Sequence, residues 1–205
     1  MTKYHHGDLR EALLDAAEEL VRERGADGWS LREASARVGV SPSAAYHHFA
    51  SRDALVRALS GRVLARLGER LAHACENASD PREGLVALGR AYVRWAVEDP
   101  AVARLAFGTR PEWSSDAVHP HDVLIAGLDR LVESGGLPAK AREGADFVYW
   151  PAVHGLAVLL ADGLVHLDDA GRQTERVVHT VLNGLTYDTT GDWPTPSSAH
   201  TDRTG

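Results

Sequence analysis

The chain has 205 residues, of which 44% are hydrophobic and 25% charged, the usual make-up of a globular protein that buries a sizeable core. Its single cysteine, Cys75, excludes an intrachain disulfide and a thiolate metal cluster within one chain. The polar first residues lack the apolar segment of a secretory signal, and no apolar run reaches the roughly 18 residues that a membrane-spanning helix needs. We therefore expect a cytoplasmic protein with no membrane partner.

Charge is distributed unevenly along the chain. The net charge is −7, yet residues 1–62 contain nine basic and nine acidic residues, so the acidic excess lies in the remainder. A neutral amino-terminal part predicts a narrow phosphate-facing strip instead of a broad basic face. A DNA-bending or DNA-organising protein that binds mainly through charge is therefore disfavoured.

Apolar residues recur with helical spacing from end to end, and no strand pattern or repeat stands out, which predicts an all-α fold. The first helix is expected over residues 8–24, where Gly25 stops it. Ser30 and Glu33 have the spacing of a capping box at the start of a second helix, and Gly39 ends that helix.

Residues 30–49 predict a helix-turn-helix, which lays one short helix into the DNA major groove. Ser41 is a preferred N-cap and Pro42 suits the first position of a third helix that ends at His48, while Phe49 is expected in the core. The alternative is a short structural helix with an aromatic core plug. On the first interpretation, hydroxyl, imidazole and methyl groups contact base edges or phosphates, and an arginine at the start of the next helix contacts a phosphate. The DNA-contacting set is then Ser30, Arg32, Ser41, Ser43, Ala44, Tyr46, His47, His48 and Arg52.

A long fourth helix is expected to begin after Ser51, with a buried stripe every four residues at Leu55, Leu59, Val63, Leu67 and Leu71. It begins beside the third helix and leaves that domain, so it is placed to transmit a change. The Asp-Pro pairs 80–81 and 99–100 begin two more helices, and residues 108–120 read as a loop. Helices are further expected over 121–134, 138–167 and 169–188, followed by a disordered tail over 189–205.

The stretch Trp150-Pro151-Ala152-Val153-His154-Gly155 lies in the helix predicted over 138–167. Pro151 should kink that helix, and Trp150 and His154 share one face because they are four residues apart. One interpretation is a ligand pocket with an apolar wall and one polar handle; the other is a tryptophan packed beside a core histidine. The aromatic residues that would line such a pocket are Tyr92, Trp95, Phe107, Trp113, Phe147, Trp150 and His154.

Sequence motifs for enzymatic chemistry are missing. The chain has no G-x-S-x-G elbow, H-E-x-x-H helix, P-loop or Rossmann glycine pattern, so neither a catalytic site nor a cofactor is expected. His119-Pro120-His121 suggests a metal site at first sight, but these residues fall in the predicted loop and are read as solvated.

Several of these motifs, in this order, resemble the TetR family of transcriptional regulators. The matching residues are Gly39-Val40-Ser41 in the turn, Tyr46-His47-His48-Phe49 at the end of the third helix, Ser51-Arg52-Asp53-Ala54-Leu55 at the next helix start, and residues 7–17. The W-x-x-x-H-G arrangement is similar to the carboxy-terminal domain of one large subgroup of that family.

The resemblance implies about nine helices in two domains: a DNA-binding domain over 7–67 and a ligand-binding and dimerisation domain over 68–188. It further implies a homodimer formed through helices 138–167 and 169–188, a palindromic double-stranded DNA operator, and a repressor that a small apolar ligand releases. The alternative is a helical small-molecule-binding protein or enzyme whose helix-turn-helix only packs.

Overall fold

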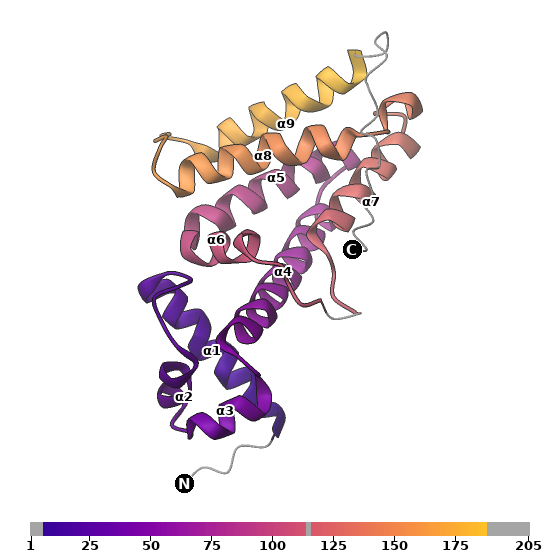
Figure 1. Ribbon diagram of the computed structural model, residues 1–205. Coiled ribbons are helices and arrows are strands. Elements are labelled where there is room, and N and C mark those ends of the chain that lie inside the picture. Colours follow the sequence, from indigo (N-terminus) through magenta and orange to yellow (C-terminus); the bar gives the residue numbers. More distant parts are fainter. Residues whose placement is uncertain (1–5, 114–115, 188–205) are drawn as a thin grey trace, which may run out of the picture.

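The computed structural model describes residues 6–113 and 116–187, and within them all regular structure is helical, as the sequence predicts (Figure 1). The predicted tail over 189–205 lies outside the described residues. The helices are α1 (His6–Arg24), α2 (Leu31–Val38), α3 (Pro42–His48), α4 (Arg52–Glu76), α5 (Pro81–Glu98), α6 (Pro100–Gly108), α7 (Pro120–Glu133), the 3-10 turn η1 (Ala139–Ala141), α8 (Ala145–Ala161) and α9 (Ala170–Tyr187).

Local hydrogen bonds begin and end α2 as the sequence indicates. Ser30 accepts a hydrogen bond from the Glu33 backbone N–H, and the Glu33 carboxylate accepts one from the Ser30 N–H, so the capping box is confirmed. Gly39 ends α2 in the left-handed region with φ 78°, where a Cβ would be strained. The side chains of Ser41 and Ser51 cap α3 and α4 in the same way. The helix-turn-helix is therefore built by its own caps.

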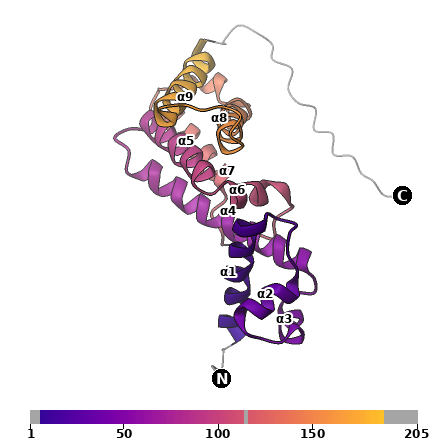
Figure 2. The ribbon, with the colours of Figure 1, turned by 90° about the vertical axis from the view of Figure 1, so that its left-hand side faces the viewer.

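α4 joins two groups of helices (Figures 1 and 2). It packs against α1 and α6, and also against α5 and α7. The predicted stripe is confirmed, because Leu55, Leu59, Val63, Leu67 and Leu71 are all buried. The same helix thus belongs to the cores of both groups.

Glu112 and Val118, which lie between α6 and α7, both contact α4. The Glu112 backbone N–H donates a hydrogen bond to the Arg57 carbonyl at 3.0 Å. A Cβ on Gly61 would stand 1.9 Å from the Glu112 carbonyl oxygen, and one on Gly68 would stand 2.0 Å from that of Val118. Only glycine lets the segment approach α4 this closely at both points.

The single helix predicted over 138–167 is wrong at both ends. Residues 139–141 form only a 3-10 turn, and α8 begins at Ala145, after Gly144 with φ 71°. It ends at Ala161, because Gly163 adopts φ 68° and the Leu164 and Val165 N–H groups turn back to the Leu159 carbonyl. Glycines with positive φ angles thus limit α8 at both ends, and the spacing of apolar residues does not reveal these angles. Pro151 lies inside α8, which continues past it.

α8 and α9 lie side by side over α5, on the side of the molecule farthest from α3 (Figure 1). The buried Tyr149 of α8 donates its hydroxyl to the Leu85 carbonyl of α5 at 2.6 Å. Gly89 of α5 lets Tyr149 and Thr174 approach, since a Cβ there would be 3.0 Å and 3.4 Å from their side chains. One face of α8 is therefore fixed to α5.

Candidate nucleic-acid interface and ligand cavity

α3 lies at the end of the molecule with one face turned outward (Figure 1). Ala45 and Phe49 point into the core with 0% and 4% exposure, which confirms the prediction for Phe49. Tyr46 is 50% exposed, although a tyrosine of this size is usually buried. This is the exposure that direct contact with base edges requires.

The other predicted contact residues of α3 differ in their accessibility. Ser41, Ser43 and His47 are exposed, whereas Ala44 and His48 are half-buried. The polar outward face is thus made of hydroxyl, phenol and imidazole groups. Their predicted contacts with DNA stay predictions.

At the start of α2, two predicted contact residues lie in different settings. The Ser30 hydroxyl donates to Glu33 at 2.8 Å and is part of the capping box. Arg32 is exposed and makes no ion pair with any described residue. By contrast, Arg24 and Arg37 pair with Glu33 and Glu23. Arg32 therefore keeps a guanidinium that a phosphate can reach.

Arg52 packs inward more than the sequence suggested. Its Nε donates to the Trp29 carbonyl at 3.0 Å, and its guanidinium carbon lies 4.9 Å from the centre of the Trp29 ring. Longer contacts reach Asp27 at 3.4 Å and Asp53 at 3.3 Å. Only 24% of the side chain is exposed. Arg52 thus links α4 to the loop before α2, and its phosphate contact remains a prediction.

Arg10 is a candidate contact residue that the sequence did not single out. Its guanidinium lies 5.2 Å from the centre of the Phe49 ring, directly after α3. The side chain is 43% exposed and has only a 3.6 Å ion pair with Glu11. The sequence around Arg10 does not predict this contact, because Phe49 lies 39 residues away in the sequence.

In the second group of helices, five of the seven predicted pocket residues form one cluster. Tyr92 and Trp95 of α5, Phe107 of α6, and Trp150 and His154 of α8 lie with ring centres 5.0–6.3 Å apart. Tyr92 is the buried centre, with 1% exposure. The four-residue spacing within α8 predicted that Trp150 and His154 lie together. The three rings from α5 and α6 join them through the tertiary fold.

The polar handle of the cluster is a pair of side chains. The Tyr92 hydroxyl and His154 Nδ1 are 2.6 Å apart. Burial raises the pKa of Tyr92 and lowers the pKa of His154. Both groups are therefore uncharged near neutral pH, and they satisfy each other at the edge of an apolar cluster.

A cavity of about 100 Å³ adjoins this cluster between α5, α6 and α8. Its aromatic side is formed by Tyr92, Phe107 and His154, and Arg104 and Asp162 also line it. Four alanines leave the space that larger side chains would fill: Ala96, Ala103, Ala157 and Ala161. Two larger open grooves, of about 400 and 390 Å³, flank the junction of α4 and α6 with α1. Trp95 lines the second groove, and no other ring of the cluster lines either of them.

The remaining two predicted pocket residues lie elsewhere. The Trp113 ring centre is 4.2 Å from that of His119, and Phe147 is 69% exposed with its ring 6.4 Å from His121. Neither joins the cluster.

The His119–His121 stretch is not the solvated loop that the sequence predicted. His119 caps α7, and His121 Nε2 lies 3.0 Å from the carboxylate of the buried Asp146. Within the described part of the chain, no three side chains are grouped so that they could hold a metal ion.

The surface of α8 has an exposed apolar face that is suited to contact with another protein. The outer face of α8 exposes Val148, Val158 and Leu159, together with Pro151 and Gly155, all at helical spacing. An exposed apolar stripe of this kind marks a contact surface. Across residues 6–113 and 116–187, no helix is both long and apolar enough to cross a membrane.

Both groups of helices match models of known protein families. Residues 13–59 match the family model described as "Bacterial regulatory proteins, tetR family", and residues 85–185 match "Tetracyclin repressor-like, C-terminal domain". The HTH-type transcriptional regulator BetI of Brucella canis is 33% identical over 147 residues, which span 66% of this chain and 73% of BetI.

Two further relatives match over nearly the whole chain. YobS of Bacillus subtilis, an uncharacterized HTH-type transcriptional regulator, is 26% identical over 181 residues, spanning 87% of this chain and 93% of YobS. The solved structure of a protein of unknown function from Rhodococcus sp. RHA1 superposes with a TM-score of 0.78 at 30% identity, covering 91% of this chain and 100% of that one.

Proposed function

Because this chain belongs to the TetR family of DNA-binding transcriptional regulators, we propose that it is a repressor that binds a palindromic operator as a homodimer and leaves it when a small molecule occupies the α5–α6–α8 cavity. The observation that carries the proposal is the outward face of α3, where Tyr46 is 50% exposed beside the exposed Ser43 and His47. Membership of a family of regulators favours this function over a helical enzyme or a binding protein without DNA. We also propose that the protein acts in the cytoplasm, where an operator is accessible.

In the proposed complex, two copies of α3 enter successive major grooves about 34–36 Å apart on one side of the duplex. Tyr46, His47 and Ser43 contact base edges, and Arg32, Arg52 and Arg10 contact phosphates. The family typically dimerises, and the exposed apolar stripe of α8 supports a dimer built from α8 and α9. Of these two helices, α8 also lines the cavity, so a ligand there acts near the surface that sets the spacing of the two recognition helices.

The experiment is a footprint on the DNA upstream of the protein's own gene, followed by binding titrations with the protected fragment at fixed salt. A symmetric protected site with half-sites one helical turn apart is the expected result. Tyr46→Ala and His47→Ala should each weaken binding about 5- to 150-fold, since a lost base contact costs about 1–3 kcal/mol.

His73→Ala is the matched control for His47→Ala, because His73 is exposed on α4 far along the helix from α3. It should bind the fragment like the unchanged protein. Equal affinity of all four proteins, with their folds intact, would contradict the proposed use of α3.

A further inference from the structure

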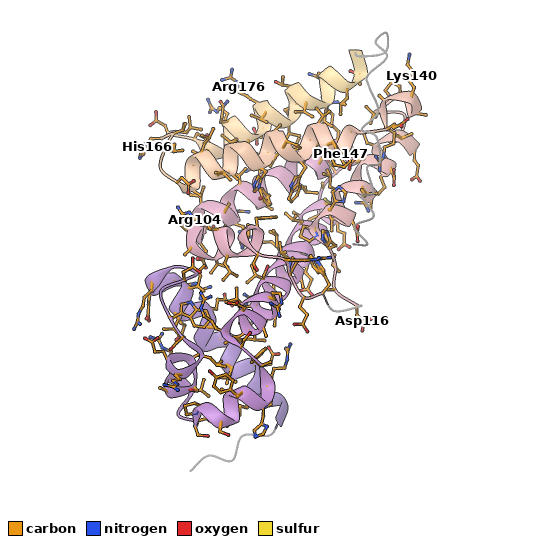
Figure 3. The ribbon with its side chains drawn as sticks, in the orientation of Figure 1. Arg104, Asp116, Lys140, Phe147, His166 and Arg176 are labelled. Carbon is orange, nitrogen blue, oxygen red and sulfur yellow. The ribbon has the colours of Figure 1, made fainter. Side chains whose placement is uncertain are left out.

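One end of the cavity already holds a positive charge that the protein itself supplies. Arg104 of α6 reaches the carboxy-terminal end of α8, where its Nε and Nη2 donate to Asp162 Oδ1 at 2.8 and 2.6 Å (Figure 3). Nη2 also donates to the Ala161 carbonyl at 3.2 Å. Both arginine and aspartate line the cavity. The guanidinium therefore shows which chemistry this end of the cavity binds.

Two features favour a cation at this position. Asp162 supplies a carboxylate, and the last turn of α8 supplies a carbonyl at the negative end of the helix dipole. His154, whose ring lines the cavity, is kept uncharged by burial and does not repel a cation. An anion would meet only Arg104, and Asp162 already neutralises that side chain.

The Arg104–Asp162 pair can be displaced. Its side chains are 57% and 36% exposed, and exposed ion pairs of this kind contribute little to stability because water and salt screen them. A ligand with the same head group loses little by replacing the guanidinium. Behind the pair, the apolar space is small: a cavity of about 150 Å³ accepts a benzene ring. The space of about 100 Å³ therefore suits a body of about four or five carbon atoms.

We propose that the cavity takes a small ligand with a hydrogen-bond-donating cationic head, a guanidinium or primary ammonium, on a compact apolar body. The head replaces Arg104 at Asp162 and the Ala161 carbonyl, and the body lies against Tyr92 and Phe107. Because Arg104 belongs to α6 and Asp162 follows α8, the same ligand separates α6 from the end of α8. This inference rests on the proposed role of the cavity as the effector site.

The test uses three probes that share a four-carbon chain and differ only in the head: butylguanidinium, butan-1-ol and butyrate. Each is titrated into the full-length protein at pH 7 by isothermal titration calorimetry, without DNA. Butylguanidinium should bind once per chain with a Kd about three- to fivefold lower than that of butan-1-ol, and butyrate should bind more weakly than either. Equal binding of the alcohol, preferred binding of butyrate, or no binding of butylguanidinium would overturn the proposal.

Variants at the two charged residues separate recognition from folding. Asp162→Asn should raise the Kd of butylguanidinium about three- to fivefold and leave that of butan-1-ol within twofold, while an equal loss for both probes would count against the proposal. Arg104→Ala removes the internal competitor and should lower the Kd of butylguanidinium at least twofold. Arg176→Ala is the matched control, because Arg176 is exposed on α9 away from the cavity (Figure 3), and it should change nothing.

Ala161→Leu gives a second measurement if Asp162→Asn fails to fold. The larger side chain fills the cavity from the end of α8 and should abolish binding of both butylguanidinium and butan-1-ol. Unchanged binding would place the probes elsewhere and overturn the proposal. Calorimetry on the free protein and footprinting on DNA are separate measurements, so failure of cation binding is distinguished from failure of the proposed regulatory function.

Discussion

Replacing Gly61 with alanine should destabilise the protein, although alanine is the better helix former. Gly61 lies inside α4, where a Cβ would stand 1.9 Å from the Glu112 carbonyl oxygen, and ordinary contact begins near 3.4 Å. Glu112 must therefore move away by about 1.5 Å. Its backbone N–H donates to the Arg57 carbonyl at 3.0 Å, so this shift breaks the hydrogen bond that holds the segment on α4.

The magnitude follows from three terms. Overpacking of backbone against a new methyl group typically costs about 1–3 kcal/mol, and the lost hydrogen bond about 0.5–1.5 kcal/mol. The helix propensity of alanine over glycine returns about 1 kcal/mol. The net expectation is a decrease of about 0.5–3.5 kcal/mol in the free energy of unfolding. Gly68→Ala should behave alike, because its Cβ would stand 2.0 Å from the Val118 carbonyl oxygen.

The assay is urea unfolding followed by circular dichroism at one fixed protomer concentration, because the stability of a dimer depends on concentration. Gly108→Ala is the matched control: Gly108 ends α6, is exposed, and has no atom within 4 Å of a built Cβ. It should be neutral or slightly stabilising. If the double variant costs less than the sum of the single ones, the segment detaches as a unit. An unchanged or raised midpoint for Gly61→Ala would refute the close approach of Glu112.

Three further changes test other contacts of the amino-terminal group. Arg52→Lys keeps a positive charge but loses the stacking on Trp29, so unfolding experiments should show a loss of about 0.5–2 kcal/mol, and unchanged stability would contradict that packing. Gly39→Ala should cost about 1–2 kcal/mol in the same assay, because φ at this position is 78°; a smaller cost in a variant that keeps its fold would mean that the turn rearranges. Burial alone would raise the pKa of Glu18, but hydrogen bonds and charge from Arg66 and Arg22 outweigh it and lower the pKa. The stabilisation from Glu18 is therefore complete above its usual pKa of 4.5 and is lost as the pH falls below it, so Glu18→Gln should flatten the acid side of a plot of stability against pH, and an unchanged slope would exclude Glu18 as the source.

The parts of the fold that sequence predicted well depend on local chemistry. The capping box at Ser30, the end of α2 at Gly39 and the start of α3 at Ser41 each involve residues within a few positions of one another. Their hydrogen bonds form whatever the rest of the chain does. The buried stripe of α4 was equally predictable, because a four-residue period assigns one helix face to the core whichever neighbours cover it.

The errors have two sources, a local backbone angle and contacts between distant segments. The helix predicted over 138–167 ends early because Gly163 takes a positive φ angle, and glycine in a sequence does not reveal its φ. Residue type alone likewise does not separate Phe107, whose ring joins the cluster, from Phe147, which is 69% exposed and lies near His121 of α7. Arg104 was missed for the same reason, because Asp162 lies 58 residues away in the sequence.

In the proposed mechanism, α6 transmits a change in the cavity toward the DNA-binding end of the molecule. Its N-cap, Asp99, accepts a 2.7 Å ion pair from Arg22 of α1, and the Ala106 carbonyl near its other end accepts a 3.0 Å hydrogen bond from Ser60 of α4. Arg104 and Phe107 of the same nine-residue helix line the cavity.

A helix this short moves as one body, so displacement of its cavity-facing side chains shifts its attachments to α1 and α4 together. The ion pair with α1 is partly exposed and contributes at most about 1 kcal/mol, whereas coupling between ligand and DNA sites is typically about 1–3 kcal/mol. In the proposed mechanism, a ligand that binds well to one position of α6 and poorly to the other changes which spacing of the recognition helices the proposed dimer adopts.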